Sequence, residues 1–155
     1  MDNKTTEQSL WGLLEGITEN LKYKRLADVF RFVSFQPFET FGPHQHLRIE
    51  INYVKKGNCI LHLENESISF NENEMMIICS NVEHTFEAGS EGTTLMQLEF
   101  LPEIFSRFNP HAQDETGELT PVTIFSEENR LIKIVNNVRI MRAVQRIVNE
   151  MNLKN

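Results

Sequence analysis

The feature that most restricts the fold is a series of short segments rich in β-branched and aromatic residues between residues 28 and 102. Each segment has the length and composition of a β-strand, and turn-forming residues separate one segment from the next. The expected strands cover residues 29–38, 47–54, 58–64, 66–70, 75–80, 84–88 and 93–100, with turns at 41–43, 55–57, 71–73 and 89–92. This spacing predicts a mainly β domain, a sandwich or small barrel, rather than alternating βαβ units.

Segments of a different character flank this series. Residues 1–27 are predicted to form an N-terminal arm, in which the apolar spacing of residues 6–22 indicates a helix. Residues 103–125 contain Pro110, Gly117 and Pro121, and we expect an irregular connection there. Residues 126–155 are predicted to form a long helix that begins at Ser126. Its broad apolar face requires two partners, such as the barrel and a second copy of the chain in a homodimer.

Charge and composition exclude several classes of protein. The net charge of the 155 residues is −7, and much of the positive charge lies in residues 126–155, so this chain alone is not expected to bind nucleic acid. Its apolar runs are too short to cross a membrane, and its start does not resemble a secretory signal. Cys59 and Cys79 lie in apolar segments and are expected to be reduced and buried. These features predict a cytoplasmic location.

The most informative motif is His44-x-His46-x3-Glu50-x6-Gly57. Alternate residues of a strand share one face, so His44, His46, Arg48 and Glu50 are expected to point into a polar cavity. His84 opens a later strand and would face the same cavity if the two strands are neighbours. Three imidazoles and a carboxylate form a donor set suited to Fe, Mn, Ni or Zn.

This spacing resembles the first signature of the cupin superfamily, and the match at His44, His46, Glu50 and Gly57 is complete. The second cupin signature is degraded and is similar only at Glu74 and His84. The resemblance implies a cupin-like double-stranded β-barrel, or jelly roll, over residues 28–102. Residues 28–152 more specifically resemble the sensing domain of AraC-family transcription regulators, because a long helix follows the barrel.

That resemblance implies a small-molecule-sensing regulatory domain, without catalytic residues, that controls a linked helix-turn-helix DNA-binding domain. No such domain can be read in this sequence, so contact with DNA would occur only through a domain outside this chain, and we expect the chain to be an excised sensing domain. The implied effector is a sugar or an organic acid, bound by some of His44, His46, Arg48, Glu50 and His84.

A metal-dependent, stand-alone cupin enzyme, a dioxygenase or sugar isomerase, is the alternative. It would use His44, His46, Glu50 and His84 as metal ligands. Arg48 argues against a metal if its guanidinium points inward and pairs with Glu50. His62 and His111 are weaker candidates for the pocket. The organic-ligand and metal readings both remain open from the sequence.

Overall fold

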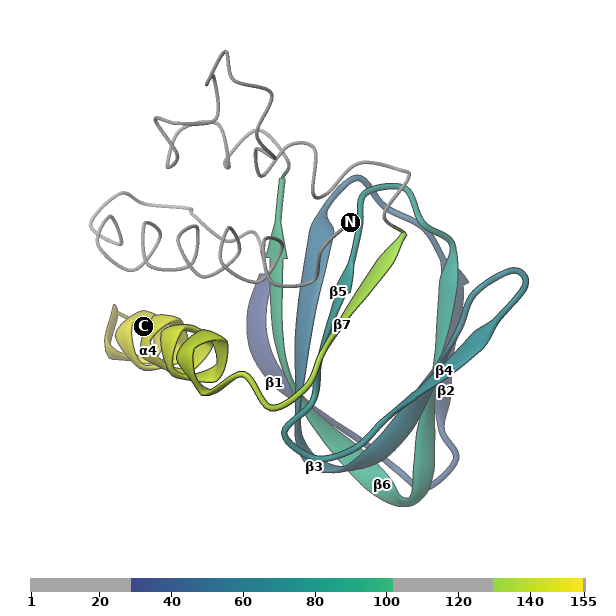
Figure 1. Ribbon diagram of the computed structural model, residues 1–155, viewed down its shortest axis with the longest axis horizontal. Coiled ribbons are helices and arrows are strands. Elements are labelled where there is room, and N and C mark those ends of the chain that lie inside the picture. Colours follow the sequence, from purple (N-terminus) through teal and green to yellow (C-terminus); the bar gives the residue numbers. More distant parts are fainter. Residues whose placement is uncertain (1–28, 102–129, 155) are drawn as a thin grey trace.

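The computed structural model describes residues 29–101 and 130–154. These residues form seven strands and one helix (Figure 1). In chain order they are β1 (Val29–Phe35), β2 (Thr40–His44), β3 (Ile49–His62), β4 (Ser67–Phe70), β5 (Met75–Ile78), β6 (His84–Phe100), β7 (Leu131–Ile134) and α4 (Val138–Lys154). The predicted arm over residues 1–27 and the predicted connection over residues 103–125 lie outside the described residues.

The strands form one antiparallel sheet that is organised around the long pair β3 and β6. The sheet has the order β1-β6-β3-β5-β7, and β2 and β4 pair with the other ends of β6 and β3. The two long strands bend midway, so the sheet folds back on itself as a barrel (Figure 1). One half of the barrel contains β1, β5 and β7, and the other half contains β2 and β4. The mainly β, cupin-like prediction is therefore confirmed.

Two of the predicted turns are wrong, because β3 and β6 bend at these positions without ending. Residues 55–57 and 89–92 were expected to reverse the chain, but β3 and β6 run through them without interruption. Register shifts occur on both sides of Lys56 and Gly57, where β-bulges bend the strand and change which side chains face inward. Gly57 and Gly92 have φ values of +82° and +80°, in the left-handed region that glycine tolerates best. Each glycine allows the two bent strands to remain paired at close approach.

Two further segments were predicted with the wrong secondary structure. Residues 41–43, predicted as a turn, lie within β2. Residues 131–134, predicted as part of the C-terminal helix, form β7 and pair with β5. The helix begins at Val138 instead, and the Asn137 side chain caps it by accepting a hydrogen bond from the Ile140 amide at 3.1 Å. The proposed cap at Ser126 lies outside the described residues.

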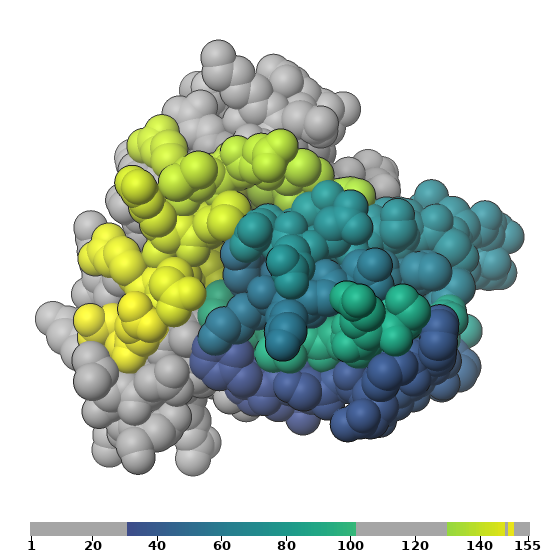
Figure 2. Space-filling view, turned by 90° about the horizontal axis from the view of Figure 1, so that it is seen from below, coloured from purple at the N-terminus to yellow at the C-terminus, as the bar shows by residue number. Residues whose placement is uncertain are grey.

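The helix α4 lies along the outside of the barrel (Figures 1 and 2). Its buried residues are Ile140, Ala143, Val144 and Ile147. They belong to the same apolar cluster as Ile49 and Ile51, which lie on the side of β3 opposite to Glu50 and Asn52. The barrel wall therefore has an apolar outer layer beneath α4 and a partly polar inner layer, and the inner layer forms the candidate site.

Candidate ligand and metal site

The bent strands bring together four residues that are far apart in the sequence. His44 ends β2 and pairs directly with His84, the first residue of β6. His46 follows in the connection between β2 and β3, and Glu50 lies near the start of β3. Glu50 also pairs with Glu99 at the far end of β6. Because β6 folds over the barrel, its first residue and its end both reach Glu50.

The four predicted metal ligands form one compact cluster. One ligand atom from each of His44, His46, Glu50 and His84 lies within 4.8 Å of all the others. The His46 Nε2 atom is 3.0 Å from Glu50 Oε2, and His84 Nε2 is 3.5 Å from the same oxygen. The His44 and His84 rings are 4.1 Å apart between centroids.

Hydrogen bonds around the cluster fix the orientations of two imidazoles. His46 Nδ1 donates to the Arg48 carbonyl oxygen at 2.8 Å, and His84 Nδ1 donates to the Val82 carbonyl oxygen at 2.7 Å. His46 therefore faces acceptors with both ring nitrogens, which favours its doubly protonated form. His84 directs Nε2 toward Glu50, and this atom has no hydrogen-bond partner among the described residues.

The electrostatics of the cluster follow from this arrangement. Burial alone would raise the pKa of Glu50, but hydrogen bonding to His46 and Asn52 and the nearby His84 imidazole outweigh burial, so the pKa is lowered. The hydrogen bond with Glu50 raises the pKa of His46 against the opposing effect of its burial. Burial and the neighbouring His84 imidazole lower the pKa of His44. The cluster thus combines a carboxylate, a proton-retaining His46 and a His44 that favours the neutral form.

These residues fit a divalent transition metal. His44 Nδ1 and His84 Nε2 are buried without hydrogen-bond partners in the described part of the chain, and imidazole nitrogens of this kind are common metal ligands. Glu50 is ionised and supplies a carboxylate oxygen to the same space. His46 completes the set once it gives up its Nε2 proton.

Arg48 does not occupy the position that was expected. Its Nε donates to Glu99 Oε2 at 2.8 Å, so the inward arrangement in which Arg48 pairs with Glu50 is not the one that the structure has. The Arg48 side chain is 39% exposed and the Glu99 side chain only 8% exposed. Arg48 therefore balances a buried carboxylate from the protein surface.

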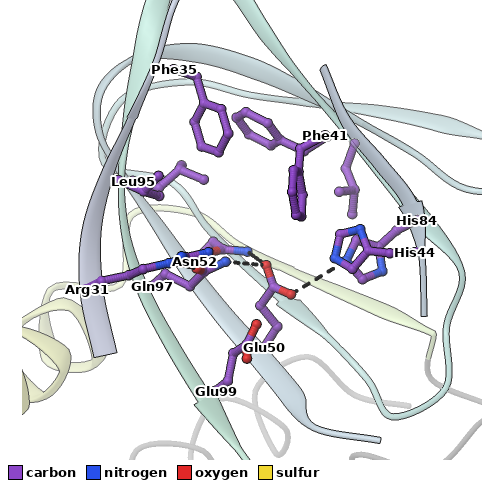
Figure 3. A pocket seen from close by; sticks show the side chains of 13 residues that line it. Arg31, Phe35, Phe41, His44, Glu50, Asn52, His84, Leu95, Gln97 and Glu99 are labelled. Atoms are coloured by element: carbon purple, nitrogen blue, oxygen red, sulfur yellow. Dashed lines mark hydrogen bonds and ion pairs between the residues drawn. The ribbon is translucent and has the colours of Figure 1, made fainter. Parts of the chain in front are cut away.

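A cavity of about 180 Å³ adjoins the cluster (Figure 3). His44, Glu50 and His84 line it, whereas His46 and Arg48 are not among its lining residues. Its other polar residues are Arg31, Asn52, Gln97 and Glu99. Its apolar part consists of Val33, Phe35, Phe41, Leu61, Phe86 and Leu95. The cavity is amphipathic, with a polar floor at Glu50 and an aromatic and aliphatic roof.

Glu50 holds the polar floor together. Its Oε1 accepts hydrogen bonds from Asn52 Nδ2 and Gln97 Nε2, both at 2.7 Å. Figure 3 shows Glu50 between the two imidazoles on one side and Arg31, Asn52 and Gln97 on the other. A ligand in this cavity would meet an ordered polar network rather than isolated side chains.

The sequence matches the profile of the AraC-like ligand binding domain over residues 28–155. The chain belongs to this family. The match covers the barrel, the cavity and α4.

The solved structure of ToxT agrees with this domain in fold. ToxT from Vibrio cholerae O395, bound to (E)-4-(8-methylnaphthalen-1-yl)but-3-enoic acid, is similar with a TM-score of 0.55 and 15% identity, over 79% of this chain and 48% of ToxT. The AraC-like domain therefore spans about half the length of the ToxT chain. A cupin-2 domain protein from Shewanella frigidimarina NCIMB 400 has 25% identity and a TM-score of 0.42, over 46% of this chain and 68% of that protein.

Bacillus subtilis oxalate decarboxylase, whose structure was studied for its Mn(II) centers, has 18% identity and a TM-score of 0.42, over 44% of this chain and 20% of the enzyme. No curated protein matched the sequence. In the described part of the AraC-like domain, no helix has the length and apolar character needed to cross a membrane.

Some site residues of the AraC-like domain could not be identified from the sequence. Arg31 lies in a strand whose neighbours are mainly apolar, and nothing in its local pattern indicates a cavity position. Gln97 and Glu99 alternate with apolar residues, which is compatible with either a solvent-facing or an inward-facing position. His62, a weaker candidate, bonds instead to Ser67 and Glu87 at 2.7 and 2.6 Å and does not line the cavity. His111 lies outside the described residues.

Proposed function

We propose that this chain is the effector-sensing domain of a bacterial AraC-family transcription regulator and binds a small molecule inside the barrel. The family match over residues 28–155 is the observation that carries the proposal. The amphipathic cavity supports it, because small-molecule sites are concave, mostly apolar and fitted with a few oriented polar groups. In this proposal the chain senses a small molecule and does not catalyse a reaction.

The effector in this proposal is a sugar or an organic acid. His44, Glu50 and His84 would contact it directly because they line the cavity. His46 would act through Glu50, and Arg48 would act through Glu99, since each holds a cavity carboxylate. The carboxylic acid bound to ToxT, a neighbour in fold, is consistent with the organic-acid alternative.

The output in this proposal is a linked helix-turn-helix domain that lies outside this chain and acts in the cytoplasm. Ligand binding would shift the population between two states of a homodimer, provided that the ligand has different affinities for those states. The helix α4 is suited to transmit such a shift because its buried residues belong to the same apolar cluster as Ile49 and Ile51, which alternate with Glu50 and Asn52 on β3. The boundaries predicted for the arm, the barrel and the connection are part of this proposal, with β7 added to the barrel and the helix beginning at Val138.

The direct test is a thermal-shift screen of sugars and organic acids against the whole chain, followed by calorimetry of the compounds that stabilise it. Val33 lines the cavity from β1, whereas the adjacent Ser34 is exposed on the opposite face. A Val33→Trp variant should lose ligand binding while a Ser34→Trp control keeps it. Binding that survives Val33→Trp unchanged would place the ligand outside the barrel and contradict the proposal.

The regulatory part of the proposal needs a separate readout. We would fuse the chain to a helix-turn-helix domain with a known operator and measure reporter transcription with and without the stabilising compound. Ligand-dependent transcription that disappears with Val33→Trp is the expected result. Binding without any change in transcription would support a binding module that has no regulatory output.

A metal-dependent cupin enzyme is the second candidate, because His44, His46, Glu50 and His84 form a complete ligand cluster. A bound Fe, Mn, Ni or Zn ion would supply Lewis-acid or redox chemistry at the end of the cavity. The test is metal analysis of the purified chain and metal titration by calorimetry, with His84→Ala as the ligand variant and His62→Ala as the matched control. About one metal per chain, lost only in His84→Ala, together with turnover would favour the enzyme. Metal binding without turnover would leave the sensing proposal in place.

A further inference from the structure

The wall of the cavity includes a cation that is absent from the sequence motif. Arg31 lies on β1, directly across from Gln97 of β6, and its side chain lines the cavity. The Arg31 Nε atom donates to Gln97 Oε1 at 2.7 Å. This bond fixes the position of the guanidinium while using one of its five N–H donors. The terminal nitrogens of Arg31 have no hydrogen-bond or ion-pair partner among the described residues.

Gln97 is oriented by its two charged neighbours. Its carbonyl oxygen accepts from Arg31, and its Nε2 donates to Glu50 Oε1 at 2.7 Å. The reverse amide orientation would direct the Gln97 NH2 group at the Arg31 donor and its oxygen at the Glu50 carboxylate. The relay Arg31–Gln97–Glu50 therefore has one preferred direction and keeps the guanidinium in place at the cavity wall.

The carboxylates of the cavity already have partners. Glu50 accepts hydrogen bonds at both oxygens, from Asn52 and Gln97 at Oε1 and from His46 at Oε2. Glu99 Oε2 is bonded to Arg48, and its Oε1 is 3.8 Å from His46 Nε2. Within the described residues, Arg31 is thus the lining residue whose charge is not paired with a carboxylate. Arg31 is exposed at the cavity wall, so an incoming anion would replace water at its guanidinium, whereas an incoming amine would compete with donors that already occupy Glu50.

The remaining lining of the cavity is apolar, and its size limits the ligand. Phe35, Phe41 and Leu95 form the wall above Arg31 and Glu50 (Figure 3), and Phe86 also lines the cavity. The volume of about 180 Å³ slightly exceeds the ~150 Å³ of an engineered apolar cavity that holds benzene. A single ring with one or two small substituents therefore fits, and a much larger molecule does not.

We propose that Arg31 is the anion-binding residue of this cavity and that the effector is a small monocarboxylate with a compact apolar body. The carboxylate pairs with the free side of the Arg31 guanidinium, where two parallel N–H donors can hold both oxygens. The apolar body packs against Phe35, Phe41 and Leu95. This inference rests on the proposed function, because it assumes that the cavity is the effector site.

Three probes that share one ring isolate the effect of charge: benzoate, benzyl alcohol and benzylamine. We would titrate each into the whole chain by calorimetry, using the wild type, Arg31→Gln, Arg31→Lys and the control Arg142→Gln. Arg142 is an exposed residue of α4, so this control removes the same charge away from the cavity. Circular dichroism would verify that every variant is folded.

The wild type and Arg142→Gln should bind benzoate at least ~10-fold more tightly than either other probe, because a charge-assisted pair is stronger than a neutral hydrogen bond. Arg31→Gln should lose this preference, and Arg31→Lys should keep part of it. Equal or tighter binding of benzyl alcohol or benzylamine would refute the inference, as would an undiminished preference in Arg31→Gln. If benzyl alcohol binds equally well and Val33→Trp blocks it, the inference fails while the barrel remains the ligand site. If no probe binds, the inference fails and the proposed function must rest on its own screen.

Discussion

Replacing Gly57 with alanine tests whether the bend in β3 holds the barrel closed. The φ of +82° is unfavourable for a residue with a Cβ atom, by about 1–2 kcal/mol. The added Cβ would also collide with the carbonyl oxygen of Gly92, which is backbone and cannot rotate away. Forcing packed atoms apart costs about 1–3 kcal/mol more. The total of about 2–5 kcal/mol is a large share of the 5–15 kcal/mol that stabilises an ordinary domain.

Equilibrium unfolding in urea, followed by far-UV circular dichroism, measures this effect. For a denaturant slope of about 2 kcal/mol per molar, Gly57→Ala should lower the unfolding midpoint by about 1–2.5 M. The neighbouring Lys56 is exposed, so Lys56→Ala is the control and should change stability by no more than about 0.5 kcal/mol. If both variants unfold at the same urea concentration, the reasoning that β3 needs glycine at its bend is refuted.

Three other outcomes follow from buried groups. Arg48→Met should destabilise the fold by about 1–3 kcal/mol in urea unfolding, because it leaves the buried Glu99 carboxylate without its charged partner. Ile147→Ala should cost about 2–5 kcal/mol in the same assay, because Ile147 is 0% exposed on the inner face of α4. Burial raises the pKa of Cys59 and of Cys79 to about 12, so stability measured against pH should fall above pH 9, by about 1.4 kcal/mol per thiol at pH 10.

Each of these outcomes has a matched control. Adding Glu99→Gln to Arg48→Met should recover part of the loss, and no recovery would mean that the Glu99 charge is not the cause. Val138→Ala removes a 55% exposed apolar residue from the same helix and should be nearly neutral, so an equal loss at Val138 and Ile147 would contradict the assigned buried face. Replacing both cysteines with alanine should flatten the pH profile between pH 8 and 10. An unchanged profile would show that other groups titrate.

The alternation of apolar and polar residues along the strands was sufficient to predict much of the fold. The spacing of the histidines and of Glu50 was sufficient to predict the composition of the cluster. The segment from residue 47 onward places Ile49 and Ile51 on one face and Glu50 and Asn52 on the other, and all four are buried on the faces expected. His44, His46, Glu50 and His84 were predicted together and lie together. Whether they hold a metal or an organic ligand stays a prediction, because both uses require the same side chains.

The errors share one physical cause, which is that local patterns do not specify partners. The pattern Lys55-Lys56-Gly57 is typical of a turn, yet the long pairing of β3 with β6 makes it a bulge inside a strand. The apolar residues in 131–134 continue the helical spacing of the apolar residues that follow them. Residues 131–134 nevertheless form β7, because their backbone pairs with the edge strand β5. The sequence offered Glu50 as the partner of Arg48 if its guanidinium pointed inward, but Arg48 binds the carboxylate of Glu99, which is 51 positions later in the chain.

The sequence by itself determined which residues share a face within an uninterrupted stretch of strand, such as Ile49 with Ile51 and Glu50 with Asn52, because side-chain alternation is a property of the extended backbone. It also determined the chemistry available at the cluster, because imidazoles and a carboxylate recur at strand spacing. Only the tertiary structure decided that β3 and β6 bend at Gly57 and Gly92, that His84 therefore meets Glu50, and that Arg31 lines the same cavity. These contacts join strands that are distant in sequence, so their geometry depends on strand register and on the close approach of backbones, which no local pattern encodes.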